Sequence, residues 1–256
     1  MRRPLTALGG PLLALTLAAS PTGRADAVIA DRRPAVVEKR VIGHSVTGRP
    51  ITAWRLGEPG RRRIVLVSSM HGDEDATSQI LDALRDGRRH VRGIDLWVVP
   101  SYNPDGIARG TRRNARGVDL NRNYPHRWAD LDGAHESGPR PASEPETRAM
   151  MDFLTEIAPR RVLSFHQPLD GVDTDTKDRG FARRLARRLR LPTTRLDCGG
   201  LCHGTMTMWF NATFPGSALT IEYGARPGRH RLRVDAPRQL LDALGARRSR
   251  RPAPGL

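Results

Sequence analysis

Residues 64–74 of this 256-residue chain have the sequence IVLVSSMHGDE. The first four residues, Ile64–Val67, are all aliphatic, which is typical of a strand that is buried on both faces of a parallel sheet. Small polar residues follow, and then His71 and Glu74, which are residue types that can act as metal ligands. A helix is expected directly afterwards, over about 75–85. A strand, a polar loop and a helix in this order form the repeating unit of an α/β fold.

The same pattern recurs along the chain. A hairpin is expected over 41–56, with its turn near residues 47–50. Further buried strands are expected at 96–99, 162–165 and 218–221, and further helices at 143–157, 181–191 and 236–244. Strands that alternate with helices predict an α/β fold, a single domain with a central mixed, largely parallel twisted sheet flanked by helices.

The longest stretch without a regular pattern covers residues 101–142. It is rich in specific polar residues, so we expect a functional loop. Ser143 and Glu146 follow it with the spacing of a capping box, which predicts the start of a helix.

The chain is strongly basic, with a formal net charge of +16, and Lys39 and Lys177 are its only lysines. The arginines are spread along the whole length, and no zinc-finger or RNA-binding motif accompanies them. We therefore expect no nucleic-acid partner. Attraction to an anionic partner such as a cell-wall polymer is compatible with this charge.

The N-terminal segment has the features of a secretory signal peptide. Arg2 and Arg3 precede a mostly apolar run over 5–19, and the small residues Ala25 and Ala27 flank Asp26 in a cleavage-site pattern. We expect a signal peptide over 1–27 that is cleaved after Ala27, a catalytic domain over 28–246, and a basic disordered tail over 247–256. No transmembrane anchor is expected after signal removal, which predicts a secreted or cell-envelope protein.

The two cysteines, Cys198 and Cys202, are four positions apart. Two cysteines do not make a structural zinc site, which needs four ligands. A disulfide in an oxidising compartment is expected, with a pair of free thiols as the alternative.

Three predicted strand ends carry residues of metal-binding or acid–base type, namely His71 with Glu74, His166, and Glu222. Active sites of open α/β sheets lie beyond the carboxyl ends of the strands. Catalytic zinc needs three protein ligands and one open position. We therefore predict one Zn²⁺ ion held by His71, Glu74 and His166.

Six short motifs, in their order along the chain, resemble those of the zinc metallocarboxypeptidases, and more narrowly of their bacterial murein peptide amidase branch. They are MHGDE (70–74), NPDG (103–106), GTRRN (110–114), GVDLNRNYP (117–125), SFH (164–166) and TIEY (220–223). The resemblance covers about 41–225. It implies a zinc carboxypeptidase-like fold and a hydrolase that cleaves amide bonds in peptides with a free carboxylate, with cell-wall (peptidoglycan) peptides as possible substrates.

The resemblance also implies roles for individual residues. Glu222 corresponds to the general base and Arg112 to the residue that stabilises the oxyanion. Asn121 and Arg122 match the pair that binds the substrate carboxylate. Asp119 matches the acid that orients a metal-bound histidine, which we expect to be His71.

Two departures from the digestive members of the family concern the substrate. Asp73 stands where those relatives carry an arginine that contacts the peptide, and their mobile tyrosine has no counterpart in 196–209, where His203 is a candidate donor. Three alternatives therefore remain: a general C-terminal carboxypeptidase, a deacylase of acylated amino acids, and a non-catalytic cell-wall binding protein.

Overall fold

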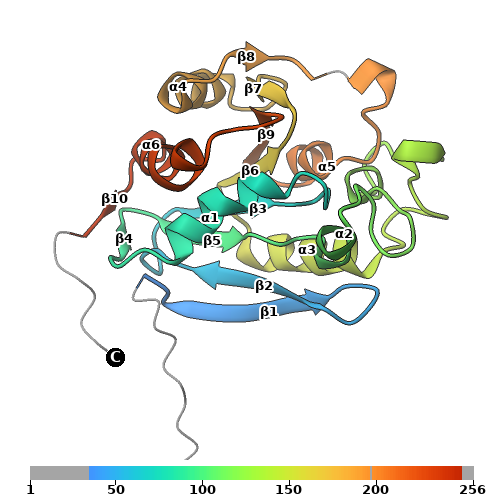
Figure 1. The fold of residues 1–256 in the computed structure, drawn as a ribbon, viewed down its shortest axis with the longest axis horizontal. Coiled ribbons are helices and arrows are strands. Elements are labelled where there is room, and N and C mark those ends of the chain that lie inside the picture. The colour runs from blue at the N-terminus through green and yellow to red at the C-terminus, as the bar shows by residue number, and fades with distance from the viewer. Residues whose placement is uncertain (1–34, 197, 250–256) are drawn as a thin grey trace, which may run out of the picture. The chain divides into compact units, whose positions relative to one another are not determined.

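The computed structural model describes residues 35–196 and 198–249, and their centre is a mixed sheet of eight strands (Figure 1). The signal peptide predicted for residues 1–27 lies outside the described residues. The strands follow the order β1-β2-β5-β3-β6-β9-β7-β8. In chain order these strands are β1 (Glu38–His44), β2 (Pro50–Arg55), β3 (Arg63–Ser68), β5 (Asp95–Val99), β6 (Arg161–His166), β7 (Leu169–Asp173), β8 (Thr193–Thr194) and β9 (Ser217–Gly224).

The middle of the sheet consists of four parallel strands, β5, β3, β6 and β9. The edges are different, because β1 and β2 form the expected antiparallel hairpin and β7 runs antiparallel to β9. Every β5 residue is buried, and so are all β3 residues except Arg63. The predicted single α/β domain with a largely parallel sheet is confirmed.

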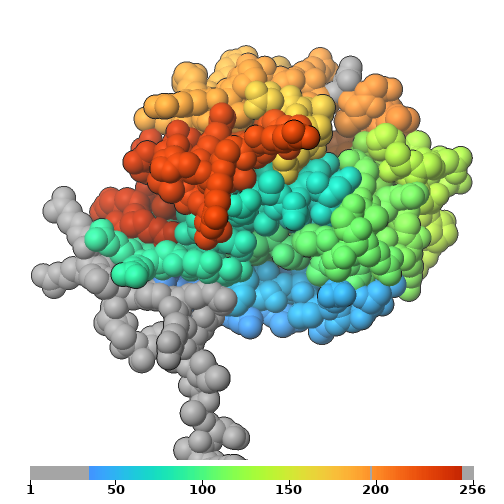
Figure 2. All heavy atoms as spheres, viewed as in Figure 1, coloured from blue at the N-terminus to red at the C-terminus, as the bar shows by residue number. Residues whose placement is uncertain are grey.

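Helices cover both faces of the sheet (Figure 1). On one face, which is turned toward the viewer in Figure 2, α1 (Ser78–Arg85), α4 (Arg179–Leu189) and α6 (Ala236–Ala243) pack on inward side chains such as Leu66. On the other face α3 (Pro145–Ile157) and α5 (Met206–Thr213) pack on Val65, Val67 and their neighbours. The alternation of adjacent residues between the two apolar clusters follows from the period of two in a strand.

The long loop between β5 and α3 contains several short helices that its sequence pattern did not predict. They are α2 (Pro104–Arg109) and two single 3₁₀ turns, Leu120–Arg122 and Gly133–His135. The side chain of Asn103 caps α2 by accepting a hydrogen bond from the Gly106 amide at 2.9 Å. Its amide nitrogen also donates to the Met70 carbonyl at 3.2 Å, so this loop is attached to the end of β3.

A close backbone contact explains the glycine that follows His71. A Cβ on Gly72 would lie 2.0 Å from the carbonyl carbon of Gly106 and 2.3 Å from the Ile107 nitrogen. No side chain fits this contact between two backbones. Gly72 therefore allows α2 to pack directly against the loop that carries His71 and Glu74.

The capping box predicted at Ser143 is wrong. The helix begins at Pro145 with Glu144 as its N-cap, and the Glu144 side chain makes no capping hydrogen bond. Ser143 Oγ instead lies 2.9 Å from Asn123 Nδ2, and Glu146 accepts from the Val46 amide and from Asn114. Tertiary partners have replaced the local ones at this helix start.

The chain is ordered past the boundary expected at residue 246. Arg247–Arg248 forms β10, which pairs antiparallel with β4 (Val91–Arg92). The Arg248 guanidinium donates to the Leu84 and Arg89 carbonyls, each at 2.7 Å, and so binds backbone at and beyond the C-terminal end of α1. The rest of the expected tail, 250–256, lies outside the described residues.

Replacing Arg248 by alanine removes these charge-assisted hydrogen bonds and leaves partly buried carbonyl groups without a donor. We expect Arg248→Ala to lower the free energy of unfolding by about 1–3 kcal/mol, measured by urea denaturation. Arg247→Gln is the matched control, because Arg247 is exposed, and its effect should stay within about 0.5 kcal/mol. Equal stability of the two variants would show that Arg248 does not hold the end of α1.

Candidate active site

The parallel strands bring the predicted site residues to one edge of the sheet. His71 and Glu74 lie in the loop after β3, while His166 ends β6 and Glu222 lies near the end of β9. His166 and Glu222 are register partners in neighbouring strands. Both are buried, and by strand alternation both side chains leave the sheet on the side that α3 and α5 cover.

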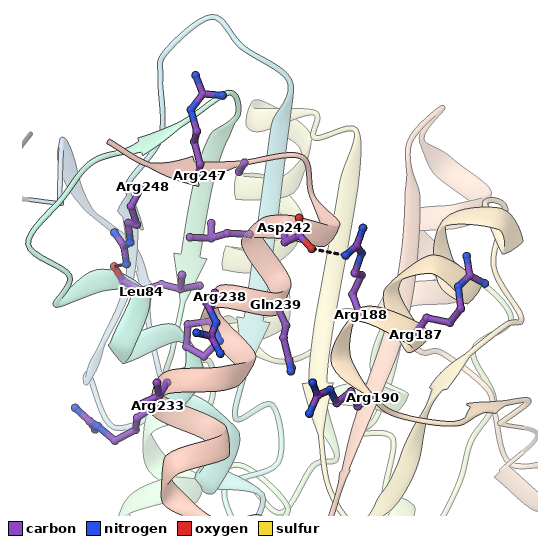
Figure 3. Close-up of a pocket in the computed structure, with 14 residues that line it drawn as sticks. Leu84, Arg187, Arg188, Arg190, Arg233, Arg238, Gln239, Asp242, Arg247 and Arg248 are labelled. Carbon is purple, nitrogen blue, oxygen red and sulfur yellow. Dashed lines mark hydrogen bonds and ion pairs between the residues drawn. The ribbon is translucent and has the colours of Figure 1, made fainter. Parts of the chain in front are cut away.

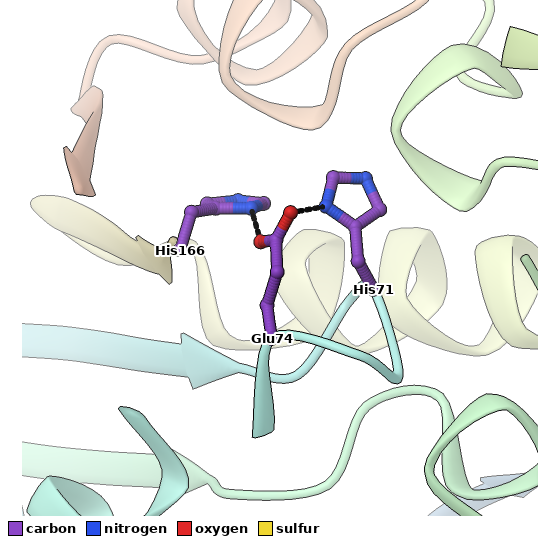
Figure 4. A group of neighbouring side chains, drawn as sticks. All are labelled: His71, Glu74 and His166. Atoms are coloured by element: carbon purple, nitrogen blue, oxygen red, sulfur yellow. Dashed lines mark hydrogen bonds and ion pairs between the residues drawn. The ribbon is translucent and has the colours of Figure 1, made fainter. Parts of the chain in front are cut away.

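His71, Glu74 and His166 converge on one point (Figure 4). Their candidate ligand atoms all lie within 4.8 Å of one another. The Glu74 carboxylate lies between the two rings, with Oε1 2.7 Å from His71 Nδ1 and Oε2 2.9 Å from His166 Nδ1. All three side chains are buried.

The second nitrogen of each ring has its own partner. His71 Nε2 donates to Asp119 Oδ1 at 3.1 Å, and His166 Nε2 lies 2.8 Å from Ser164 Oγ. These contacts fix both rings so that their Nδ1 atoms face Glu74. Two imidazole nitrogens and a carboxylate, each histidine held from behind, form a donor set that fits Zn²⁺.

The charges of this cluster depend on one another. Burial lowers the pKa of His71, but the carboxylates of Asp119 and Glu74 more than offset it, and the pKa rises to about 9. Burial opposes ionisation of Glu74 and Asp119 as well, yet His71 holds the pKa of each carboxyl well below its usual range. The cluster therefore needs positive charge at its centre, which a divalent cation also supplies.

Arg112 adds a cation at the rim of this cluster. Its Nε donates to Asp119 Oδ2 at 3.0 Å, and its Nη1 donates to Glu74 Oε1 at 3.2 Å. The side chain is partly exposed, at 28%. The guanidinium therefore touches a predicted metal ligand and faces solvent at the same time.

Asn121 and Arg122 lie in the 3₁₀ turn that follows Asp119. Asn121 Oδ1 accepts from the Met206 amide at the start of α5 at 3.1 Å, which directs the other end of its amide away from that helix. Arg122 is 3% exposed, its Nη1 donates to the Asn121 carbonyl, and its Nε has no hydrogen-bond partner among the described residues. Burial lowers the pKa of Arg122, and Arg112 lowers it further, while Asp119 opposes them.

Glu222 lies beside His166 at the same edge of the sheet but does not belong to the cluster of three. Its Oε2 accepts from the Leu169 amide at 3.3 Å. Burial raises the pKa of its carboxyl, and the nearby Glu74 also raises it, whereas His166 lowers it. A buried carboxylate with few hydrogen bonds is well suited to exchange protons.

The segment before α5 contains the two cysteines and the histidine that were singled out in the sequence, Cys198, Cys202 and His203. Cys198 and Cys202 form a disulfide. His203 is held by the Arg127 carbonyl, which lies 3.1 Å from its Nδ1. Gly204 follows with φ +58°, and a Cβ there would lie 2.3 Å from the Arg122 carbonyl oxygen, so this loop packs directly on the Arg122 backbone.

Two contacts of the cluster were not predicted. Ser164 lies behind His166, and the Gln167 amide donates to Glu74 Oε2 at 3.3 Å. Ser164 precedes His166 by two positions in a strand, so the two side chains share a face, and that spacing was a usable signal. A backbone amide such as that of Gln167 has no signal in the sequence.

Comparisons with known proteins identify the family to which the chain belongs. The zinc carboxypeptidase family matches residues 27–168. Murein peptide amidase A of Escherichia coli strain K12 is 34% identical over 169 residues, which cover 59% of this chain and 67% of that protein. Carboxypeptidase D of Rattus norvegicus is 31% identical over 179 residues, which cover 50% of this chain and 12% of that protein.

Solved structures agree with the sequence matches. The murein-tripeptide amidase MpaA from Escherichia coli O157 superposes with a TM-score of 0.65 and 26% identity, over 84% of this chain and 94% of that chain. Carboxypeptidase A from Helicoverpa armigera shares the fold, with a TM-score of 0.64 and 18% identity, over 83% of this chain and 68% of that chain. Because the family match covers more than half of its length, the chain belongs to the zinc carboxypeptidase family and is a zinc-dependent hydrolase.

Proposed function

We propose that this hydrolase cleaves an amide bond in murein peptides that carry a free carboxylate. The observation that carries the proposal is the largely buried guanidinium of Arg122, which lies in the turn after Asp119 and makes one hydrogen bond among the described residues, to the Asn121 carbonyl. A buried cation without a full set of partners is costly unless an anion binds it. A substrate carboxylate is the natural anion beside a zinc site, and the 34% identical relative is a murein peptide amidase.

In the proposed mechanism each residue has one task. His71, Glu74 and His166 would hold the zinc ion. When bound, the ion polarises the scissile carbonyl and acidifies a water molecule. Glu222 takes a proton from the attacking water and passes it to the leaving amine. Arg112 offers a fixed positive charge to the oxygen that becomes negative in the transition state.

Substrate orientation falls to Asn121 and Arg122. A guanidinium and a carboxylate form paired, charge-assisted hydrogen bonds, so Arg122 selects a free carboxylate over an amide. Asn121 is oriented by its bond to the Met206 amide and can donate to the same group. Asp73 is exposed beside the cluster, where digestive relatives carry an arginine, and this difference favours a murein peptide over an ordinary peptide.

Export is part of the same proposal. The signal peptide predicted for 1–27 would direct the chain to the cell envelope or the medium. The Cys198–Cys202 disulfide supports this location, because disulfides persist mainly in oxidising compartments. Among the described residues, no helix combines the length and the apolar composition that a membrane crossing requires.

The direct test is a substrate profile of the purified protein with and without a chelator. We expect hydrolysis of murein tripeptide, loss of that activity with the chelator, and little hydrolysis of blocked dipeptides. A tripeptide whose terminal carboxylate is amidated should be a poor substrate if Arg122 binds that group. Hydrolysis of blocked dipeptides alone would indicate a general carboxypeptidase, and a zinc-loaded protein inactive on every substrate would indicate a non-catalytic role.

Glu222→Gln keeps the shape of the side chain but removes its ability to accept a proton. We expect kcat to fall by about 10²–10⁴-fold, while zinc content and thermal stability stay unchanged because Glu222 is outside the ligand cluster. Steady-state kinetics and elemental analysis measure the two effects separately. Equal kcat for the variant and the wild type would remove Glu222 as the base.

Asp119→Asn weakens the hydrogen bond that orients His71 and should reduce zinc affinity about 10–100-fold. Competition with a chromophoric chelator measures the affinity. Asp73→Asn is the matched control, since it removes the same charge from an exposed neighbouring position, and it should leave zinc affinity nearly unchanged. If both variants lose affinity equally, the effect comes from charge in general and not from the contact with His71.

A further inference from the structure

A second concave surface lies away from the zinc site, along helix α6 (Figure 3). This arginine groove has a volume of about 980 Å³, and none of its lining residues belongs to the candidate active site. Its walls come from the C-terminal part of α4, from the π-helical turn Arg231–Asp235 with α6, and from β10. His166 and Glu222 leave the sheet on the opposite face, so an occupant of the groove does not cover them.

The charge of the groove is almost entirely positive. Seven of its lining residues are arginines, and Asp242 is its one acidic residue. Asp242 is already paired with Arg188 at 2.9 Å, as Figure 3 shows. The exposed side chains of Arg190, Arg233 and Arg247 have no hydrogen-bond or ion-pair partner within residues 35–196 and 198–249.

Structural needs do not account for these three arginines. The carbonyls at the end of α4 are bound by Arg231, whose Nη2 donates to the Arg190 carbonyl at 3.2 Å. The backbone at and beyond the end of α1 is bound by Arg248. A helix end that is already bound by one cation gains little further stability from a second one. Positively charged side chains that face the same groove also repel each other, which lowers stability.

The residue types that line the groove limit the classes of ligand that it can bind. No aromatic side chain lines the groove, so it offers no surface on which nucleic-acid bases could stack. Val234, 47% exposed, is the one large exposed apolar residue in the lining, which is too little to insert into a lipid bilayer. Guanidinium groups bind phosphates through paired hydrogen bonds, and here they come from several elements along one groove.

We propose that the arginine groove binds a linear polymer of repeated phosphodiester groups that carries no bases, as in polyol-phosphate polymers of cell envelopes. Several phosphates of one strand would pair with Arg190, Arg233 and Arg247 at once. Such binding would hold the enzyme on an anionic matrix while the zinc site, on the other side of the sheet, stays open to peptides. The proposal does not depend on which peptide the hydrolase cleaves.

The test uses the purified protein and a fluorescently labelled oligomer of glycerol phosphate, with binding followed by anisotropy at increasing salt. The variant Arg190→Gln/Arg233→Gln/Arg247→Gln should bind about tenfold or more weakly at low salt and should show a shallower salt dependence. The matched control is Arg179→Gln/Arg183→Gln/Arg195→Gln, which removes the same charge from exposed positions outside the groove. The control should keep at least half of the wild-type affinity, and both variants should keep wild-type melting temperature and hydrolase activity.

Three outcomes would overturn the proposal. One is a wild-type protein that does not bind the oligomer at low salt. Another is an equal loss of affinity in the two triple variants, which would mean that net charge and not the groove attracts the polymer. The third is tighter binding to single-stranded DNA or to phosphatidylglycerol vesicles than to the oligomer, which would assign the groove to a different class of partner.

Discussion

The candidate active site depends on one carboxylate held between two imidazole rings. Glu74 reaches His71 with one oxygen and His166 with the other, although His166 is 92 residues further along the chain. Such a buried group is stable only where opposite charge surrounds it. The parallel pairing of β3 with β6 makes this possible, because it brings the loop after one strand beside the end of the other.

The surrounding chain serves to keep that geometry rigid. Asp119 and Ser164 hold the histidine rings from behind, and Asn103 attaches the loop of α2 to the end of β3. Gly72 and Gly204 permit two backbone contacts that no larger residue could make. The long loop is part of the candidate site, since its residues Arg112 and Asp119 contact Glu74 and His71, and Arg122 follows in the next turn.

Charge is distributed unevenly between the site and the rest of the molecule. The site contains buried carboxylates in contact with histidines and arginines, so its charges largely neutralise one another. The arginine groove along α6 contains exposed arginines and a single acid that is already paired. A net charge of +16 is thus more than a property of composition, because part of it is concentrated on one concave surface.

By itself the sequence determined the elements with strong local signals and the protein family, and it predicted which residues form the candidate site. Predominantly apolar runs such as Ile64–Val67 predicted the four central strands, because a strand buried on both faces consists mostly of apolar residues. The residues of metal-ligand type at the strand ends and the six motifs predicted the zinc carboxypeptidase fold and family. The two-residue strands β8 and β10 were not predicted, since they are too short for any pattern. The strand β7 and the helix α5 were not predicted because LDGVD has no apolar run and the apolar residues of MTMWFNAT show little helical periodicity.

Only the tertiary structure decided which residues far apart in the sequence contact one another. The capping pattern at Ser143 and Glu146 was overridden by Asn123, Asn114 and the Val46 backbone, because tertiary hydrogen bonds replaced local ones. Arg248 became part of the fold because the end of α1 offers it carbonyl acceptors. The gathering of arginines from α4, the π-helical turn and β10 into one groove is likewise a product of packing, since these segments are separate in the chain and adjacent only in the folded molecule.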